Sequence, residues 1–379
     1  MPLGEYALLL ASALVSALTN LLGLPQRGRP PRRILVVKVD HLGDAITATP
    51  ALRALRDAHP LAIIDLVLNP AVEPLFHDTP LANHVLAYDS PLFRRRAPEP
   101  ENGTRDGSGI RRDVIAHEPY DTIVELRGDW KTLGLPLRTR AARRADRGTV
   151  RLGDWIGRKL RMNRRQPLHE VETNLAIVKP LLVAGPPSVT APPPEIHVTT
   201  EADRSMRAAL VSAGLDPSRP FIAVHPAAAW RPRAWRPERF AALLDRLAAH
   251  GLPFAVVGLA TERDVEQAMR AAVREARVAW LFGALTLPEI AALLRTSRLF
   301  IGNDSGLAHL AAACGTPVVA LFGPQDPRRF APRSPLARAL HHRVPCCPCA
   351  QKVCIRPDLP CVNLIEIAEV EAAARAALG

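Results

Sequence analysis

Aromatic side chains are scarce in this sequence of 379 residues, where they make up 4% of the total and include only three tyrosines. The formal charge of +12 would suit a nucleic-acid partner. However, the arginines are spread along the chain and are not interleaved with aromatic residues in a recognisable RNA-binding or DNA-binding motif. We therefore expect no nucleic-acid partner. Anionic lipids, diphosphates and phosphorylated sugars would match the positive charge equally well.

The cysteines lack the even distribution of a secreted disulfide framework. Of six cysteines, Cys314 is isolated and the other five lie between Cys346 and Cys361. This uneven spacing favours a reducing compartment, so we expect a cytoplasmic protein. The five thiols are enough for a tetrahedral zinc site, although their spacings are not a paired CxxC arrangement. A structural zinc ion or a redox bridge is the lesser alternative, and no catalytic metal is expected.

Long apolar runs are absent apart from one near the start of the chain. No charged residue occurs from Tyr6 to Gln26, and four arginines follow between positions 27 and 33. No basic segment precedes the run, which disfavours a signal peptide. We predict that residues 1–30 form an apolar helix that spans a membrane or lies on an anionic membrane surface. A helix packed on the body of the protein is the alternative, because weakly polar residues recur along one face.

The length of the chain suits two α/β domains of roughly 150 to 200 residues each. In both halves, short apolar segments alternate with helical patterns, as in parallel α/β folds. Strands are predicted at 34–37, 63–68, 84–87, 122–126, 221–224, 254–257, 278–281, 299–301 and 318–321. Five prolines between Gly185 and Pro194 stiffen an extended connection. We predict domains over residues 31–185 and 195–379, with a charged loop over 93–113.

A first polar motif follows the strand at 34–37. Asp44 lies in the turn before a helix, where a carboxylate could accept the proton of a hydroxyl group that acts as a nucleophile. The alternative is that Asp44 only caps the helix. Asp40 is a second carboxylate nearby and competes for the role of base. Gly43 would permit close approach of the chain to a substrate.

A second polar motif follows the strand at 299–301. The loop Gly302-Asn303-Asp304-Ser305-Gly306 precedes a helix that begins near Ser305. Unpaired backbone N–H groups and the positive helix end would face the crevice above the sheet, which suits a diphosphate. The alternative is that Asp304 or Ser305 merely caps the helix.

Together these motifs resemble glycosyltransferase family 9. The run from Leu281 to Pro327, which includes Gly302–Gly306 and His309, looks like the donor-binding half of that family, and the run from Ile34 to Asp44 is similar to its opening motif. The resemblance extends, with gaps, from about Arg33 to the C-terminus. It implies the GT-B fold, an α/β architecture of two Rossmann-like domains with parallel sheets facing a central cleft. The last helix is then expected to cross back to the first domain.

The resemblance also implies a reaction. The family contains the heptosyltransferases of lipopolysaccharide core assembly, and it inverts the anomeric centre without a divalent metal or other cofactor. We expect transfer of a sugar, by default heptose from ADP-heptose, to a hydroxyl of a cell-envelope glycan or lipid-linked saccharide at the cytoplasmic face of the inner membrane. The alternative is a non-catalytic, membrane-associated protein that binds nucleotide sugars or acts as a scaffold.

The resemblance assigns the two residues expected to carry the chemistry. The family places its proposed catalytic base at the position of Asp44. The segment from His225 to Trp235 resembles its phosphate-facing loop, in which a basic residue two before the tryptophan maps onto Arg233. Here arginine replaces the usual lysine, and the alanines at 227–229 stand where glycine or serine is frequent. This departure keeps the non-catalytic alternative open.

The remaining candidates would bind the two substrates. Glu262 is expected at the ribose hydroxyls and Asp304 at the hydroxyls of the transferred sugar. The expected donor-binding set is His225, Glu262, Asn303, Asp304, Ser305, Gly306 and His309. The expected acceptor-side set is Asp40, Gly43, Arg127 and His169. Helix capping is the alternative for Glu262 and structural packing for His309, while Arg127 and His169 have solvated or structural alternatives.

Overall fold

A computed structural model describes residues 30–88, 119–127, 141–147, 168–182, 191–349, 353–356 and 360–379. The chain divides into two compact units, Met1–Pro192 and Pro193–Gly379, and the division falls within the proline-rich segment. The apolar helix predicted over residues 1–30 and the loop predicted over 93–113 lie outside the described residues, apart from residue 30. Among the described residues, no helix has the length and apolar character needed to cross a membrane.

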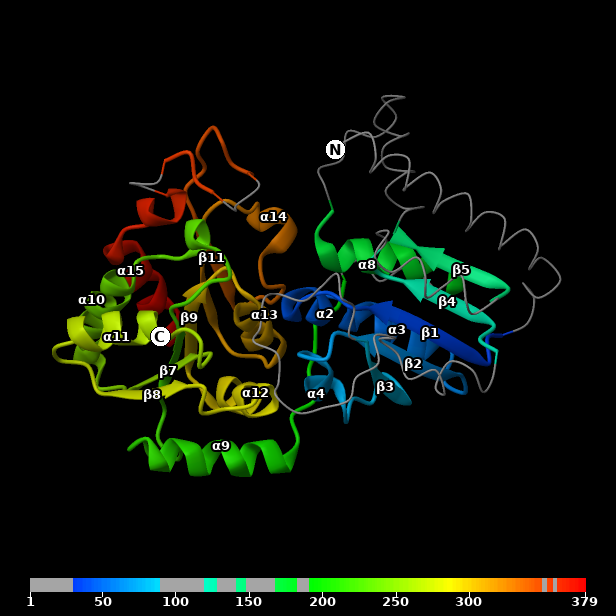
Figure 1. The fold of residues 1–379 in the computed structure, drawn as a ribbon, viewed down its shortest axis with the longest axis horizontal. Coiled ribbons are helices and arrows are strands. Elements are labelled where there is room, and N and C mark those ends of the chain that lie inside the picture. Colours follow the sequence, from blue (N-terminus) through cyan, green and yellow to red (C-terminus); the bar gives the residue numbers. More distant parts are fainter. Residues whose placement is uncertain are drawn as a thin grey trace. The chain divides into compact units, whose positions relative to one another are not determined.

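The first unit contains a five-stranded sheet in the order β3-β2-β1-β4-β5 (Figure 1). All of its neighbouring strands are parallel. The strands are β1 (Arg33–Lys38), β2 (Ile63–Leu68), β3 (His84–Ala87), β4 (Thr122–Glu125) and β5 (Arg143–Asp146). The apolar run at 34–37 places β1 in the centre, because a strand covered on both faces needs apolar residues at every position.

The described part of this unit also contains helical segments. They are α2 (Leu42–Ile46), α3 (Thr49–Ala58), α4 (Glu73–Phe76), α8 (Glu170–Val178) and η2 (Lys179–Leu181). In α3 the buried residues Ala51, Leu52 and Leu55 recur at helical spacing, and the helix packs against α8. The sequence predicted that Asp44 lies in a turn before one helix, whereas the structure has two helices here and Asp44 lies in the first of them. The short helix α2 carries Asp44 directly after the central strand.

The second unit contains a six-stranded parallel sheet in the order β11-β10-β9-β6-β7-β8 (Figure 1). Its strands are β6 (Ile222–His225), β7 (Phe254–Gly258), β8 (Val278–Phe282), β9 (Leu299–Asn303), β10 (Val318–Phe322) and β11 (Ala337–His341). Its helices are α9 (Thr200–Ser212), α10 (Pro237–Leu247), α11 (Arg263–Ala272), α12 (Leu287–Thr296), α13 (Gly306–Ala313), α14 (Pro327–Phe330) and α15 (Ile367–Leu378). Three 3₁₀ segments complete it: η3 (Arg231–Arg233), η4 (Ala248–His250) and η5 (Cys361–Leu364).

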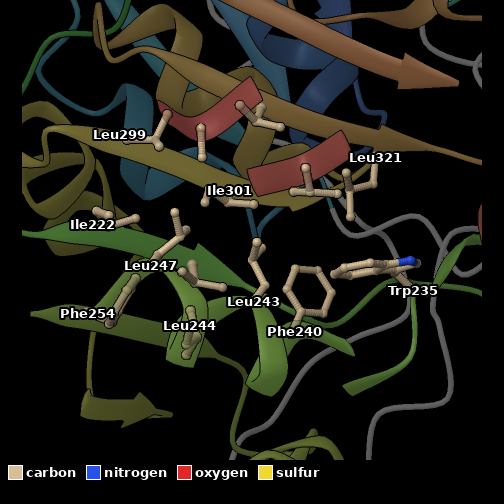
Figure 2. Packing of buried hydrophobic residues seen from close by; sticks show 14 of the residues in the cluster. Ile222, Trp235, Phe240, Leu243, Leu244, Leu247, Phe254, Leu299, Ile301 and Leu321 are labelled. Atoms are coloured by element: carbon tan, nitrogen blue, oxygen red, sulfur yellow. The ribbon is translucent and has the colours of Figure 1, made fainter. Parts of the chain in front are cut away.

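The core of the second unit lies between this sheet and α10 (Figure 2). Trp235, which precedes α10, is fully buried and meets the ring of Phe240 edge to face, with centroids 5.0 Å apart. Its indole N–H donates to the carbonyl of Ile365 over 3.0 Å, which ties this loop to the C-terminal segment. Helix α15 buries Val370 and Ala374 in the same core. The prediction that α15 crosses back to the first unit stays a prediction.

Every strand predicted from the sequence is present, but β5 and β11 were missed. β5 reads Arg-Arg-Ala-Asp, which gives no apolar pattern, yet Arg144 is buried and lies 3.6 Å from the carboxylate of Glu125 on β4. β11 is an edge strand with only partly buried residues. Neither carries the apolar alternation by which a strand is recognised in sequence.

All six cysteines are free thiols in the structure. The thiol of Cys347 is buried and donates to the carbonyl of Pro324 over 3.4 Å. Within the described ranges, no three side chains among His, Cys, Asp and Glu are grouped as ligands for a metal ion.

Gly302 on β9 is a position where the fold has no room for a side chain. A methyl group there would lie 2.8 Å from the ring of Phe300 and 2.9 Å from the carbonyl oxygen of His225. We expect Gly302→Ala to lower the free energy of unfolding by about 1–3 kcal/mol, because the adjacent strand must shift. Urea unfolding followed by circular dichroism would measure this, and an unchanged midpoint would contradict the packing described for β6 and β9.

Candidate functional site

The candidate donor-side residues lie at the carboxyl edge of the second sheet. β6 ends at His225 and β9 ends at Asn303, and the two strands are paired so that His225 lies opposite Gly302. The loops that follow them therefore leave the sheet side by side. This edge is where ligands bind in open parallel sheets.

The side chain of Asn303 fixes the loop that follows β6. Its amide N–H groups donate to the carbonyls of Pro226, at 2.7 Å, and Ala227, at 3.3 Å, while its oxygen accepts the backbone N–H of Trp235 at 3.0 Å. The residue is wholly buried. Both ends of the loop that carries η3 are thus held by one side chain, which makes Asn303 a residue that positions Arg233.

Arg233 and Asp304 form an ion pair across these two loops. Asp304 is 3% exposed, and burial raises the pKa of its carboxyl group, an effect that the Arg233 guanidinium opposes. The guanidinium is partly exposed, and its Nε atom is buried without a hydrogen-bond partner in the described part of the chain. A buried donor left without an acceptor is unfavourable by about 1–3 kcal/mol, so the arginine retains donor capacity that Asp304 does not satisfy.

His225 connects the loop after β9 to the loop after β7. Its Nδ1 atom lies 3.3 Å from the hydroxyl of Ser305, and its Nε2 atom lies 3.7 Å from the carboxylate of Glu262. Burial alone would raise the pKa of Glu262, but His225 and the backbone N–H of Leu259, which donates over 2.8 Å, hold that pKa below its usual value. Glu262 is thus a half-buried anion beside a histidine.

The helix predicted after the loop at 302–306 begins near Ser305, as the sequence indicated. Ser305 occupies the N-cap position of α13 in an extended conformation, and the helix starts at Gly306. Ser305, Gly306 and His309 all retain partial exposure. The structure therefore brings the predicted donor-binding residues together at one edge of the second sheet, with Arg233 and the positive end of an eight-residue helix adjoining Asp304.

Asp44 lies at the corresponding edge of the first sheet, in the first turn of α2. It is partly exposed, and among the described residues it has no ion-pair partner at contact distance. Desolvation by the surrounding protein raises the pKa of Asp44, and the ammonium of Lys38 opposes that rise. Gly43, beside it in α2, is also partly exposed. Asp44 is therefore a partly exposed residue whose carboxyl group has a raised pKa.

Asp40 has different surroundings from Asp44. It is 7% exposed, lies 2.8 Å from the ammonium of Lys38 and forms a second ion pair with Arg127. Its carboxylate is therefore committed to two cations. Arg127, predicted on the acceptor side, is held by this contact just after β4.

His169 is placed as a helix cap. It is 6% exposed, and its Nδ1 atom accepts the backbone N–H of Val171 at the start of α8 over 3.2 Å. The same nitrogen lies 3.6 Å from the carboxylate of Glu172. This geometry matches the structural alternative for His169, because its polar atom serves the end of the helix.

Sequence reasoning missed a group of buried charges behind Asp44. Lys38 is 2% exposed, and Arg147 donates to the carbonyl of Leu126 over 2.9 Å and pairs with the buried carboxylate of Glu170. The lysine at the end of an apolar strand was the one signal in the sequence. Arg147 and Glu170 lie 23 residues apart, and no local pattern connects them.

Comparisons with known proteins agree with this geometry. The model of glycosyltransferase family 9 (heptosyltransferase) matches residues 112–359. Lipopolysaccharide heptosyltransferase 3 of Escherichia coli is 27% identical over 292 residues, which cover 75% of this chain and 81% of the relative. Lipopolysaccharide heptosyltransferase 2 of Salmonella typhimurium is 28% identical over 316 residues, which cover 81% of this chain and 87% of the relative.

Solved structures show the same fold. A family 9 glycosyl transferase from Veillonella parvula superimposes with a TM-score of 0.75 at 22% identity, covering 92% of this chain and 97% of that one. The ADP-heptose lipopolysaccharide heptosyltransferase II of E. coli gives a TM-score of 0.68 at 22% identity, covering 91% and 98%. The GT-B fold class predicted from the sequence is confirmed. Because the family model matches well over half of its residues, the chain belongs to glycosyltransferase family 9 (heptosyltransferase) and is a glycosyltransferase.

Proposed function

We propose that this glycosyltransferase moves heptose from ADP-heptose to a hydroxyl of the lipopolysaccharide core, with inversion at the anomeric carbon. The observation that carries the proposal is the ion pair of Arg233 and Asp304 next to the N-terminus of the eight-residue helix α13, which presents a guanidinium at the edge of the sheet. The names of the relatives support the choice of sugar and acceptor. The donor is chosen because one solved neighbour is titled an ADP-heptose heptosyltransferase.

In this proposal the second unit binds the donor. Arg233, Ser305 and the start of α13 hold the diphosphate, and Glu262 accepts hydrogen bonds from the ribose hydroxyls. Asp304 orients hydroxyls of the transferred sugar, while His309 lines the diphosphate end. His225 and Asn303 act through the loops that they fix. Because Arg233 and the helix supply positive charge, the leaving diphosphate is stabilised without a divalent metal.

Asp44 on the first unit is the proposed general base. Asp40 is the competitor that the sequence left open, but its carboxylate is shared between Lys38 and Arg127, whereas Asp44 is a partly exposed residue whose carboxyl group has a raised pKa. A base with a raised pKa accepts a proton more readily near neutral pH. On this ground we assign the proton transfer to Asp44, and we place Asp40, Gly43 and Arg127 on the acceptor side, whereas His169 caps α8.

The reaction is a single displacement. The acceptor oxygen attacks the anomeric carbon as its proton passes to Asp44, a new carbon–oxygen bond forms, and the bond to the diphosphate breaks. The electron pair of that bond leaves with the nucleoside diphosphate, whose negative charge Arg233 stabilises.

The formal charge of +12 supports activity at an anionic membrane surface, which we place at the cytoplasmic face of the inner membrane.

Replacement of the proposed base should stop transfer but not donor binding. We expect Asp44→Asn to lower kcat by about 10²- to 10⁴-fold, because the acceptor proton then has no base to receive it. Release of ADP from ADP-heptose, with a lipopolysaccharide-core acceptor and a chelator present, measures the rate. The affinity for ADP, measured by calorimetry, should stay within about twofold, since Asp44 belongs to the other unit.

Asp40→Asn is the matched control for this experiment. If Asp40→Asn reduced kcat as severely while Asp44→Asn kept normal turnover, the two assignments would be reversed. If the unaltered protein bound ADP-heptose tightly but released no ADP with any of a broad set of acceptors, the non-catalytic alternative would be correct. Loss of turnover on adding the chelator would contradict the metal-independent reaction.

We expect Arg233 to stabilise the transition state of sugar transfer more than it stabilises the folded protein. We expect Arg233→Ala to lower kcat by about 10²- to 10³-fold, because the leaving diphosphate loses its main cation. Arg233→Lys, which restores the residue usual in the family, should recover most of the rate. Steady-state kinetics of ADP release measures both variants, and the melting temperature checks that each is folded. If Arg233→Ala and Arg233→Lys lowered kcat equally, positive charge at this position would not be the property that stabilises the leaving diphosphate.

A further inference from the structure

The chain that follows β11 combines exposed apolar side chains with positive charge. We call this the tip surface, and it consists of Arg343, Val353, Ile355 and Arg356. The chain that carries it is drawn from orange to red in Figure 1. β11 runs parallel to β10, and β10 to β9, so β11 ends at the same edge of the second sheet as the residues proposed to bind the donor.

The apolar members of the tip surface are open to solvent. Val353 is 84% exposed and Ile355 is 80% exposed, more than any other large apolar side chain described in the second unit. Between them, Sγ of Cys354 accepts the backbone N–H of Arg356 over 3.4 Å, and Cys354 is partly buried. The turn therefore covers part of Cys354 and leaves Val353 and Ile355 in water. Two such side chains at one turn suit a partner that removes them from water.

Contacts with the body of the second unit hold this part of the chain. Sγ of Cys347 donates to the carbonyl oxygen of Pro324 over 3.4 Å, and the backbone N–H of Cys349 donates to the same oxygen over 3.3 Å. Burial and the neighbouring thiols of Cys347, Cys349 and Cys354 raise the pKa of Cys361, at the start of η5, to about 11. The turn that carries Val353 is therefore connected to a packed base.

The tip surface lies in a stretch of sequence that lacks carboxylates. Between Asp326 and Asp358 there are seven lysines and arginines and no acidic residue. Arg343 and Arg356 are exposed, and among the described residues neither lies within ion-pair distance of a carboxylate. Both guanidinium groups therefore keep their positive charge available to a partner.

The carboxylates that reach this stretch from its flanks are paired with other basic groups. Asp326 lies 2.7 Å from the guanidinium of Arg328, and Glu369 on α15 lies 2.9 Å from Nε2 of His342. Their negative charge is thus opposed by these neighbours. The field around the tip surface remains positive, which favours an anionic partner.

We propose that the tip surface docks on an anionic lipid bilayer, with Val353 and Ile355 inserted at the level of the head groups and the two arginines bound to lipid phosphates. Aliphatic side chains flanked by cations are typical of interfacial membrane contacts. A nucleic acid would use the arginines but would leave the aliphatic side chains in water. A second copy of this chain that met the tip surface with its own would bring like charges together.

The inference rests on the membrane location in the proposed function and assigns that contact to particular residues. It does not depend on which sugar is transferred or on which carboxylate is the base. Because the tip surface and the donor-binding residues share one sheet edge, docking brings the donor close to the lipid surface. A lipid-linked acceptor is presented at the same surface.

The first test is the partition of the full chain onto vesicles made of equal parts of phosphatidylglycerol and phosphatidylcholine, measured by co-sedimentation. We expect Val353→Asp combined with Ile355→Asp to lower the partition coefficient by about tenfold or more, because apolar contacts are lost and like charge is added. Val211→Asp combined with Ser212→Asp is the matched control. Both control residues are exposed on α9 of the same unit, so the same charge is added elsewhere.

The second test removes positive charge. Arg343→Gln combined with Arg356→Gln should lower the same coefficient by about tenfold or more, from roughly fivefold for each basic residue near an anionic surface. Arg204→Gln combined with Arg219→Gln removes the same charge from exposed positions elsewhere in the unit. This control should change the coefficient by less than about threefold, because salt screens charges that lie away from the contact.

A third measurement locates the contact, since residues 1–30 are expected to bind the same vesicles. Short-pulse amide hydrogen exchange of residues 343–349 and 353–356 should slow when the full chain binds, while exchange in α9 stays unchanged. The melting temperature and ADP release with a water-soluble core oligosaccharide check that each variant is folded and active.

The outcomes separate the inference from the proposed function. Loss of partition in both tip-surface variants but not in the controls, together with slowed exchange at the tip, supports the inference. Normal partition in these variants with unchanged exchange at the tip overturns it and leaves binding to residues 1–30. If the unaltered chain ignores anionic vesicles, the membrane location in the proposed function is also wrong, whereas ADP release still tests the transfer reaction. Slowed exchange at the tip on adding DNA or on self-association, but not on adding vesicles, would assign the surface to that partner and overturn the inference.

Discussion

The loops at the carboxyl edge of the second sheet depend on the hydrogen bonds of one buried amide. Asn303 ends β9, and its side chain holds the carbonyls after β6 and the backbone N–H of Trp235. Trp235 in turn anchors the loop in the core and binds the carbonyl of Ile365. Because both ends of the loop are fixed, Arg233 meets Asp304 without a long, mobile connection. A preorganised cation of this kind does not have to reorient when charge develops on a leaving group.

The two units use the same architecture for different chemistry. Each has a parallel sheet whose carboxyl edge carries polar loops, because all strands of a parallel sheet end on the same side. In the second unit that edge carries a cation and a helix N-terminus beside Asp304. In the first it carries Asp44, backed by the buried charges of Lys38, Asp40 and Arg147. In the proposed function, the edge in the second unit binds the diphosphate and the edge in the first unit accepts the proton.

Both sheet edges contain buried charged side chains. Asp304, Lys38, Asp40 and Glu170 are all less than 9% exposed, and each has a partner of opposite charge. Such pairs add little net stability, because the desolvation penalty offsets much of their attraction. Their effect is instead to shift pKa values and to fix geometry. The exposed or half-exposed members, Arg233 and Asp44, are the ones that we assign to the reaction.

The sequence by itself determined the fold class and the positions of most strands, because buried parallel strands read as short apolar runs separated by helical patterns. It also determined the two loops that carry the candidate site, since Asp44 and the segment 302–306 each follow such a run directly. It failed for β5, where Arg144 is buried and pairs with Glu125, so that the strand has no apolar pattern.

Only the tertiary structure distinguished the surroundings of Asp40 from those of Asp44, because Asp40 pairs with Arg127, which is 87 residues away in the chain. It likewise showed that the side chains of Asn303 and His169 form hydrogen bonds with backbone groups. It also showed that Lys38 is buried among charged side chains from other segments. The physical reason is common to these cases. Burial and pairing depend on groups brought together from distant strands, and no local sequence pattern encodes which partners a side chain will meet.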